Sequence, residues 1–357
     1  MHMADALLSP PVAATLYAAT AATACISVRA VRKESDTARI PTMAVMAAFV
    51  FAGQMVNYAI PGTGASGHLC GGMLLSAVLG PFAGFLSMLV VLAIQCLFFA
   101  DGGLLALGAN CWNMAFYGCF AGYFLFWRPL TCASGLSQSQ MRTRIAAASI
   151  LGCIAALQLG ACSDVIETSL SGVTDLPFGK FCMLMQPIHL AIGLVEGLIT
   201  SSVLLFVHKA RPEFLFGIER QEADIDSRIS RRAVLVVLAV VAAFIGGGLA
   251  LLASGNPDGL EWALSRSDNT ASETAGFATD EDSCDDKGGI TDVASAIQDK
   301  TAVLPDYAFP ESDSSAGTMV SGLVGSTLVG CVAFVICLWL GLFRSRARTR
   351  SSSRNGC

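Results

Sequence analysis

Nine stretches of mostly apolar residues, separated by charged or Gly/Pro-rich segments, constrain this chain more than any other feature. A helix needs about 20 such residues to cross a bilayer, and most of the stretches come close to that length. Charged residues make up only 14% of the chain, against about 25% in ordinary soluble domains. The stretches cover residues 12–31, 42–60, 71–79, 82–100, 105–127, 145–162, 183–207, 233–254 and 319–343. The sequence therefore predicts an all-α integral membrane protein with one visibly short segment at 71–79.

The positive charges indicate how these segments are oriented. With the N-terminus outside, every Lys and Arg faces the cytoplasm except Lys180, Arg266, Lys287 and Lys300, as the positive-inside rule requires. We therefore expect a multi-pass protein of the cell membrane with a cytoplasmic C-terminus. The expected domains are a seven-segment helical bundle at 1–210, a charged cytoplasmic connector at 211–231, a two-span helical hairpin at 232–345 with an acidic external loop at 255–317, and a basic cytoplasmic tail at 346–357.

A polar external loop is expected between the sixth and seventh segments. Four charged residues fall there, Asp164, Glu167, Asp175 and Lys180. Cys162 and Cys182 flank this loop and could form a disulfide, whereas most other cysteines lie inside apolar stretches and read as small core residues. The sequence leaves this bridge open.

The first two residues offer an unusual set of metal donors. The amine of Met1, the backbone nitrogen of His2 and the imidazole of His2 can close adjacent chelate rings around one ion. Three nitrogens in a near-planar arc suit a square-planar cation such as Ni(II) or Cu(II). We expect Met1 to be retained, because His2 is not a small residue. A fourth ligand then has to come from elsewhere in the chain.

His68 is a candidate for that fourth ligand. It lies in a Gly-rich loop at 62–72 between two membrane segments. Irregular backbone at membrane depth is tolerated where it is buried in protein or lines a cavity. The alternative is a satisfied polar residue without a metal role. His208, beside Lys209 at a cytoplasmic helix end, is expected to be an interfacial residue.

His189 and Glu196 are seven residues apart and therefore share one helix face, two turns apart. A carboxylate inside the membrane is costly and marks either a functional group or a buried pair. One interpretation gives both residues a supporting or relay role beside the metal, and neither is predicted to be a ligand. The other interpretation is a packing network with Asn57, Gln95, Asn110 or Asn113.

Three small residues, Ala14, Ala18 and Ala22, recur at every fourth position of the first segment. Small residues at this spacing let helices approach closely. They could form a docking face for a partner subunit. Ordinary packing inside the bundle explains them equally simply, because the segment is rich in alanine.

Several motifs closely resemble the substrate-binding components of nickel/cobalt energy-coupling-factor transporters, the NikM/CbiM family. The resemblance covers residues 1–210, with its motifs in the family order. These motifs are Met1-His-Met-Ala-Asp-Ala-Leu-Leu-Ser-Pro10, Ser66-Gly-His-Leu-Cys-Gly-Gly72, Gln95-Cys-Leu-Phe-Phe-Ala-Asp-Gly-Gly-Leu104, Leu107-Gly-Ala-Asn-Cys-Trp-Asn-Met114 and His189-Leu-Ala-Ile-Gly-Leu-Val-Glu-Gly-Leu-Ile-Thr200. A second stretch, Asn256-Pro-Asp-Gly-Leu-Glu261, is similar to the signature of the NikN/CbiN-like PDGLE accessory subunit.

The resemblance implies a ligand set and a position in a larger assembly. In that family the metal is held at the positions of Met1, His2 and His68, and Ni²⁺ or Co²⁺ is the transported substrate rather than a bound cofactor. The partners implied are a coupling transmembrane T subunit and two ATP-binding subunits, with membrane lipid around the chain. Met3 departs from the aliphatic residue often found there, and we interpret it as an apolar filler.

The function expected is therefore capture and import of a divalent metal, without an enzymatic activity of its own. The chain lacks a Gly-x-x-x-x-Gly-Lys-Ser/Thr phosphate loop, so ATP hydrolysis has to come from partners. No nucleic-acid partner is expected. The alternatives are a Co²⁺ importer that supplies cobalamin synthesis, an ion-coupled secondary metal carrier that uses Asp101 and Glu196, and an intramembrane metalloenzyme.

Overall fold

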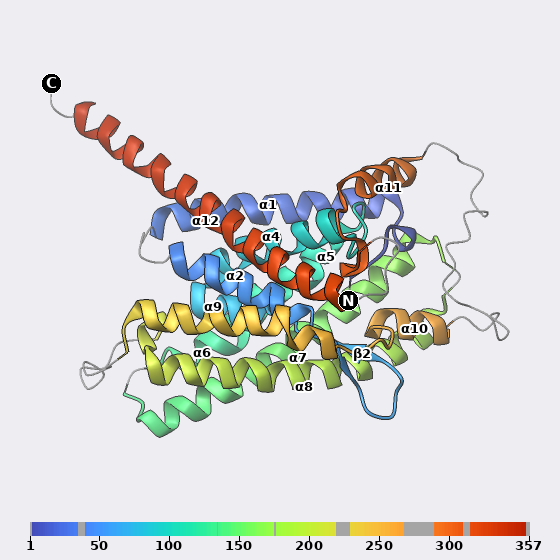
Figure 1. Ribbon diagram of the computed structural model, residues 1–357, viewed down its shortest axis with the longest axis horizontal. Coiled ribbons are helices and arrows are strands. Elements are labelled where there is room, and N and C mark those ends of the chain that lie inside the picture. The colour runs from blue at the N-terminus through green and yellow to red at the C-terminus, as the bar shows by residue number, and fades with distance from the viewer. Residues whose placement is uncertain are drawn as a thin grey trace.

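The computed structural model describes residues 2–34, 40–133, 135–174, 176–218, 229–267, 289–309 and 315–354 (Figure 1). Within these residues, six helices are long and apolar enough to cross a membrane: α1, α4, α7, α8, α9 (continued by η6) and α12. In chain order, with η for a 3₁₀-helix except the π-helical η3, the elements are η1 (Asp5–Leu7), α1 (Pro10–Glu34), α2 (Ile40–Gln54), β1 (Tyr58–Ala59), β2 (Ser66–Gly67), α3 (Gly72–Leu79), α4 (Pro81–Phe99), α5 (Leu107–Asn110), η3 (Cys111–Trp127), α6 (Arg128–Thr131), α7 (Gln138–Ser171), α8 (Phe178–Ala210), η4 (Pro212–Phe214), α9 (Arg231–Gly247), η6 (Leu249–Leu252), α10 (Gly259–Ser267), α11 (Ile290–Thr301), η7 (Pro305–Tyr307) and α12 (Ser315–Arg354).

The all-α membrane fold expected from the sequence is confirmed. Each of the nine apolar stretches contains a helix, and three of those helices are not among the six above. They are α2, α3 and the continuous helix formed by α5, η3 and α6. The helices begin where local chemistry favours them: Ser137 and Gln140 form a capping box before α7, and Pro81 occupies the first position of α4.

The polar loop predicted between the sixth and seventh segments is wrong in its extent. Helix α7 continues to Ser171 and α8 begins at Phe178, so six residues join them. Asp164 and Glu167 lie inside α7 and are buried. Their carboxylates face hydrogen-bond donors in the bundle, which allows charged residues to continue an apolar helix. Cys162 and Cys182 carry free thiols.

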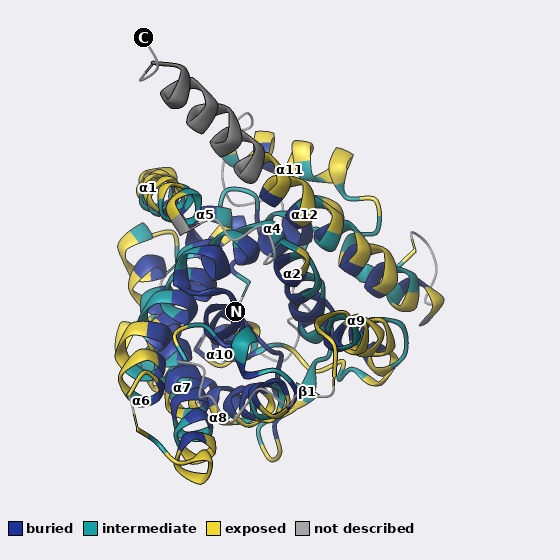
Figure 2. Ribbon diagram, turned by 90° about the vertical axis from the view of Figure 1, so that its left-hand side faces the viewer, coloured by how far each residue is buried: buried dark blue, intermediate teal, exposed yellow. Residues whose placement is uncertain are grey.

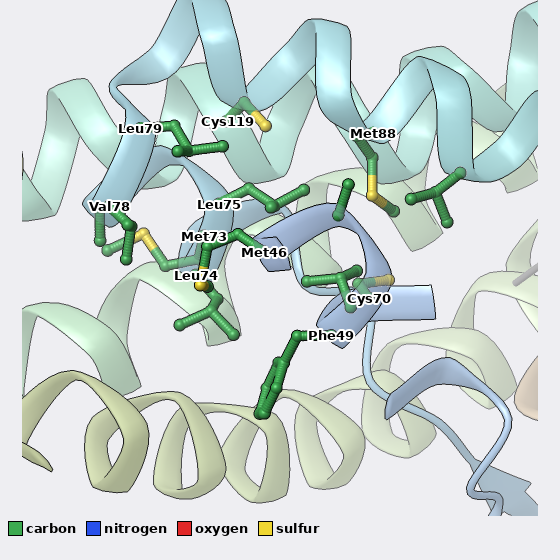
Figure 3. Packing of buried hydrophobic residues seen from close by; sticks show 14 of the residues in the cluster. Met46, Phe49, Cys70, Met73, Leu74, Leu75, Val78, Leu79, Met88 and Cys119 are labelled. Atoms are coloured by element: carbon green, nitrogen blue, oxygen red, sulfur yellow. The ribbon is translucent and has the colours of Figure 1, made fainter. Parts of the chain in front are cut away.

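The short helix α3 lies at the centre of the core. All eight of its residues are buried, and Met73, Leu75 and Leu79 pack among side chains of α2, α4 and η3 (Figure 3). Gly72 meets Gly118 of η3 so closely that a Cβ on Gly72 would lie 2.9 Å from the Gly118 Cα. Small residues at such crossings let membrane helices pack by direct backbone contact.

The second part of the chain packs against the first. Helices α9 and α12 contact each other and α2, and Gly246 and Gly322 bring their backbones together. Helices α10 and α11 lie at the right-hand end of the bundle in Figure 1, while α12 runs out toward the C-terminus at the opposite end. Residue Phe216, just after α8, anchors the chain under α3: its N–H donates to Ala77 and its carbonyl accepts from the Trp127 indole.

Candidate metal centre

The N-terminal segment, residues 2–4, is held in place by Asn110 of α5 and by the turn that follows α4. Asn110 pairs with the backbone of Met3 through two hydrogen bonds, one to the Met3 N–H at 2.7 Å and one to its carbonyl at 3.2 Å. The Gly103 N–H also donates to the Met3 carbonyl, and the Met3 side chain is fully buried. A Cβ at Gly103 would overlap the carboxylate of Asp5, so glycine is needed for this close approach. Asn110 thus fixes the position of the Met3 backbone.

The imidazoles of His2 and His68 lie stacked, with ring centroids 5.2 Å apart and planes 22° from parallel. Nδ1 of His2 lies 3.2 Å from the Asp101 carboxylate, and Nδ1 of His68 lies 3.1 Å from the Leu69 carbonyl. In both rings Nε2 is buried and has no hydrogen-bond partner among the described residues. Both rings line one cavity of about 550 Å³, which also includes Asp101, Gln54 and Tyr307. The structure therefore brings together the two histidines singled out by the sequence.

Burial keeps these imidazoles neutral. Removal from water, with a smaller contribution from the neighbouring His2, lowers the pKa of His68 to about 4. The pKa of His2 is also lowered by burial, although the charge of Asp101 opposes the shift. A neutral imidazole keeps a lone pair, which a transition metal requires. The environment therefore suits metal binding near neutral pH.

The described side chains alone do not supply a complete set of metal ligands. Among the described residues, no cluster of three His, Cys, Asp or Glu side chains is placed to hold a metal ion. The remaining predicted ligand, Met1, lies outside the described residues.

Glu196 fixes the loop that carries His68. Its two carboxylate oxygens accept hydrogen bonds from the backbone N–H groups of Cys70 (2.9 Å) and Gly71 (3.0 Å). The amide of Gln54 donates to the Cys70 carbonyl at 2.8 Å. Gly71 has φ of +83°, which favours glycine at this position. The sequence placed Glu196 on one helix face with His189, but its attachment to this loop was not predicted.

His189 stands beside the second part of the chain. Its Nδ1 lies 2.8 Å from the Met185 carbonyl, one turn earlier in α8. A Cβ on Gly259, the first residue of α10, would lie 3.1 Å from the His189 ring. His189 and Glu196 therefore share a helix face as predicted, but they contact different segments.

Asn113 connects two buried carboxylates. Its amide donates to Asp164 at 2.6 Å and to Glu167 at 2.8 Å, and it also approaches the Met3 sulfur at 3.9 Å. Ser163 donates a further hydrogen bond to Glu167. These donors pair with one oxygen of Asp164 and with both oxygens of Glu167, residues that the sequence had placed in a polar loop. The other oxygen of Asp164 has no hydrogen-bond partner among the described residues.

Residues 256–262, which lead from the end of η6 into α10, pack against the His68 loop. The Ser66 N–H donates to the Pro257 carbonyl at 2.8 Å, and the Ser66 hydroxyl donates to the Asn256 carbonyl. The Trp262 indole donates to Thr63, also at 2.8 Å. Asp258 and Glu261 from the same segment line the cavity that contains both imidazoles.

The alanine stripe of α1 faces outward. Ala14, Ala18 and Ala22 are all exposed, and α1 shows an exposed outer face in Figure 2. Packing of this stripe inside the bundle is therefore not what the structure has. His208, expected at the membrane interface, is instead buried with 6% of its surface exposed.

Two family models match separate parts of the chain. Residues 2–214 match the model described as the cobalt uptake substrate-specific transmembrane region, CbiM. Residues 232–342 match the PDGLE domain.

Individual relatives include fused nickel transport proteins and a cobalt transport protein. A NikMN-type fused nickel transport protein of Archaeoglobus fulgidus is 34% identical over 94% of this chain and 98% of its own length. The fused nickel transport protein NikMN of Rhodobacter capsulatus is 29% identical over 92% of this chain and 95% of its own. The cobalt transport protein CbiM of Geobacter sulfurreducens is 30% identical over 67% of this chain and 68% of its own.

A solved structure agrees with this assignment. The crystal structure of a transition metal transporter aligns with a TM-score of 0.50 and 32% identity, and covers 58% of this chain and 93% of its own. The chain therefore belongs to the CbiM family of cobalt uptake substrate-specific transmembrane regions, with a PDGLE domain fused to it in one polypeptide.

Proposed function

We propose that this chain captures Ni²⁺, or Co²⁺, on the outer side of the cell membrane as the substrate-specific component of an energy-coupling-factor importer. The observation that carries the proposal is the stacked pair of buried, neutral imidazoles, His2 and His68, in one cavity. The relatives named above are nickel and cobalt transport proteins, which supports a metal substrate.

The metal is held by four nitrogens in this proposal. The Met1 amine and the His2 backbone nitrogen close a five-membered chelate ring. The same backbone nitrogen and Nδ1 of His2 close a six-membered ring, and His68 supplies the fourth ligand through Nε2. Four nitrogens in a plane suit Ni(II), and by the usual affinity order they bind Co(II) less tightly.

The partners are those that the resemblance to the NikM/CbiM family implies. The chain acts with a coupling transmembrane subunit and two ATP-binding subunits, and the exposed stripe Ala14, Ala18 and Ala22 is the docking face on α1. The N-terminus lies outside the cell and the C-terminus in the cytoplasm. Supply of cobalt for corrin synthesis is the second candidate, favoured by the similarity to cobalt transport proteins.

The test compares the native N-terminus with one extended by a few residues before Met1. The extension removes the terminal amine from its ligand position but leaves the other donors in place. We expect tight Ni²⁺ and Co²⁺ binding by the purified protein, and uptake by cells, to be lost. The same residues added at the C-terminus serve as the control. Equal binding by both forms would refute the chelate.

A further inference from the structure

A side chain of the PDGLE domain reaches the metal site through one intermediate. The Tyr307 hydroxyl donates a 2.5 Å hydrogen bond to Oδ2 of Asp101. The other oxygen of that carboxylate lies 3.2 Å from Nδ1 of His2. Burial and the charge of Asp101 raise the pKa of Tyr307, so its hydroxyl remains protonated and acts as the donor. Tyr307, Asp101 and His2 therefore form a continuous chain of contacts between the two domains.

The backbone of the same turn is held by the segment before Tyr307. The Gln298 amide donates to the carbonyls of Cys96 (3.0 Å) and Gly102 (2.8 Å). The N–H groups of Val303 and Leu304 both donate to the Phe98 carbonyl. These contacts surround the turn that carries Asp101 and that also binds the N-terminal segment through Gly103. The segment from Gln298 to Leu304 is thus docked on this turn, and it places Tyr307 beside Asp101.

The backbone at Tyr307 is strained. Asp306 and Tyr307 have φ of 51° and 59°, in the left-handed region that residues other than glycine rarely adopt. Such conformations persist where the surroundings enforce them, and they cluster at functional positions. The Tyr307 ring stacks on Phe99 with centroids 4.8 Å apart, which secures the ring independently of the hydroxyl. The strained backbone conformation therefore places the Tyr307 hydroxyl beside Asp101.

The nitrogen that Asp101 contacts is the same one that the proposed chelate uses. A neutral imidazole that faces a carboxylate through Nδ1 carries its proton there, because the carboxylate can only accept. Binding of a metal at Nδ1 then requires His2 to leave Asp101, and its proton to move from Nδ1 to Nε2 with no net loss. Asp101 and the metal therefore compete for Nδ1 of His2.

We propose that Tyr307 is a positioning residue that holds Asp101 against His2 and thereby weakens metal binding, so that the PDGLE domain favours release. This inference rests on the proposed function for its second half. Without the Tyr307 hydroxyl, Asp101 is free to turn away, the metal-free state loses one hydrogen bond, and the metal-bound state gains in population. A residue that merely stabilised the turn would have the opposite effect, because its loss would disorder the ligands.

The first measurement uses metal-free protein labelled with ¹⁵N-histidine. With four histidines in the chain, the imidazole nitrogens can be assigned one by one with single His variants. We expect His2 to carry its proton on Nδ1 in the native protein and to shift toward the Nε2 tautomer in Tyr307→Phe. A native His2 protonated on Nε2, or an unchanged tautomer in the variant, would overturn the proposal. This result does not depend on metal binding, so it separates the inference from the proposed function.

The second measurement is the Ni²⁺ affinity, obtained by competition with a chelator. Loss of one hydrogen bond from the competing state should make Tyr307→Phe bind Ni²⁺ roughly fivefold more tightly. Tyr117→Phe is the matched control, because its hydroxyl contacts Ser163 inside the bundle, and it should bind like the native protein. Equal or weaker binding by Tyr307→Phe contradicts a releasing role. Failure of the native protein to bind Ni²⁺ would instead refute the proposed function.

Discussion

Gly259 at the start of α10 lies directly against the imidazole of His189 in α8. A methyl group on Gly259 would stand 3.1 Å from the ring and 3.2 Å from the side chains of Ile188 and Ile192. Helix α10 also buries Leu260 against the cluster around the N-terminal segment. The glycine of this segment thus sets how closely the PDGLE domain approaches the CbiM region.

A larger residue at this position should loosen the contact. Gly259→Val forces branched carbons into the space occupied by three side chains, and overpacking of this kind typically costs about 1–3 kcal/mol. We expect a lower thermal unfolding midpoint of the detergent-solubilised protein and easier proteolysis of the segment 254–264. Gly255→Val is the control, because a Cβ there meets no atom within 4 Å. Similar losses in both variants would contradict the role of the His189 contact.

Replacement of Glu196 should release the His68 loop. In Glu196→Gln one carboxylate oxygen becomes an NH₂ group, which cannot accept from the N–H of Cys70 or Gly71. A supporting residue of a metal site typically affects affinity by about 10–100-fold when it is lost. We therefore expect Ni²⁺ affinity to fall by about tenfold, with the fold retained by circular dichroism. Ser202→Ala, on an exposed face of the same helix, should bind normally.

Removal of the His68 imidazole should abolish tight binding. In the proposed chelate, His68→Ala leaves the three nitrogen ligands at the N-terminus but removes the fourth ligand of the square-planar site. We expect the visible absorption band of square-planar Ni(II) to disappear on titration of the purified protein. His208→Ala, near the other end of α8, removes a buried imidazole away from the site and should leave the band unchanged. A band of normal intensity in His68→Ala would exclude His68 as a ligand.

Acidification should destabilise the metal-free protein through His68. The folded-state pKa of about 4 lies below the unfolded value near 6.5, so between these limits the unfolded chain binds more protons. Stability is therefore present above pH 6.5 and is lost as the pH falls toward 4, by about 2 kcal/mol at pH 5. Equilibrium unfolding across this range measures the slope, and His68→Gln should flatten it. An equal slope in the variant would place the pH dependence elsewhere.

The membrane architecture could be predicted because it depends on patterns that are local in the sequence. Apolar runs, their lengths and the asymmetry of Lys and Arg identify helices without reference to tertiary contacts. His2 and His68 could be singled out from residue type and from a motif, since few other donors in the chain suit a square-planar metal, and the structure brings the two rings together. The face of α8 that carries His189 and Glu196 followed from helical spacing.

What could not be predicted depends on partners far away in the sequence. Asp164 and Glu167 resembled loop residues until Asn113, about fifty positions earlier, supplied their hydrogen bonds. Asp101, which lies beside His2, accepts a hydrogen bond from Tyr307, 206 residues later. No periodicity signals such contacts, because each one joins side chains that only the packed helices bring together.

The fusion of the two parts in one polypeptide affects how the docked segment around Gln298 and Tyr307 behaves. Attachment to the same chain gives that segment an effective concentration that is roughly millimolar for a short flexible tether. A few hydrogen bonds would be too weak to hold two dilute proteins together. In one chain they can keep this segment bound to the turn that carries Asp101 most of the time, and still allow it to dissociate within one transport cycle. Each metal site also carries its own accessory domain in fixed one-to-one stoichiometry, whatever amount of protein the cell makes.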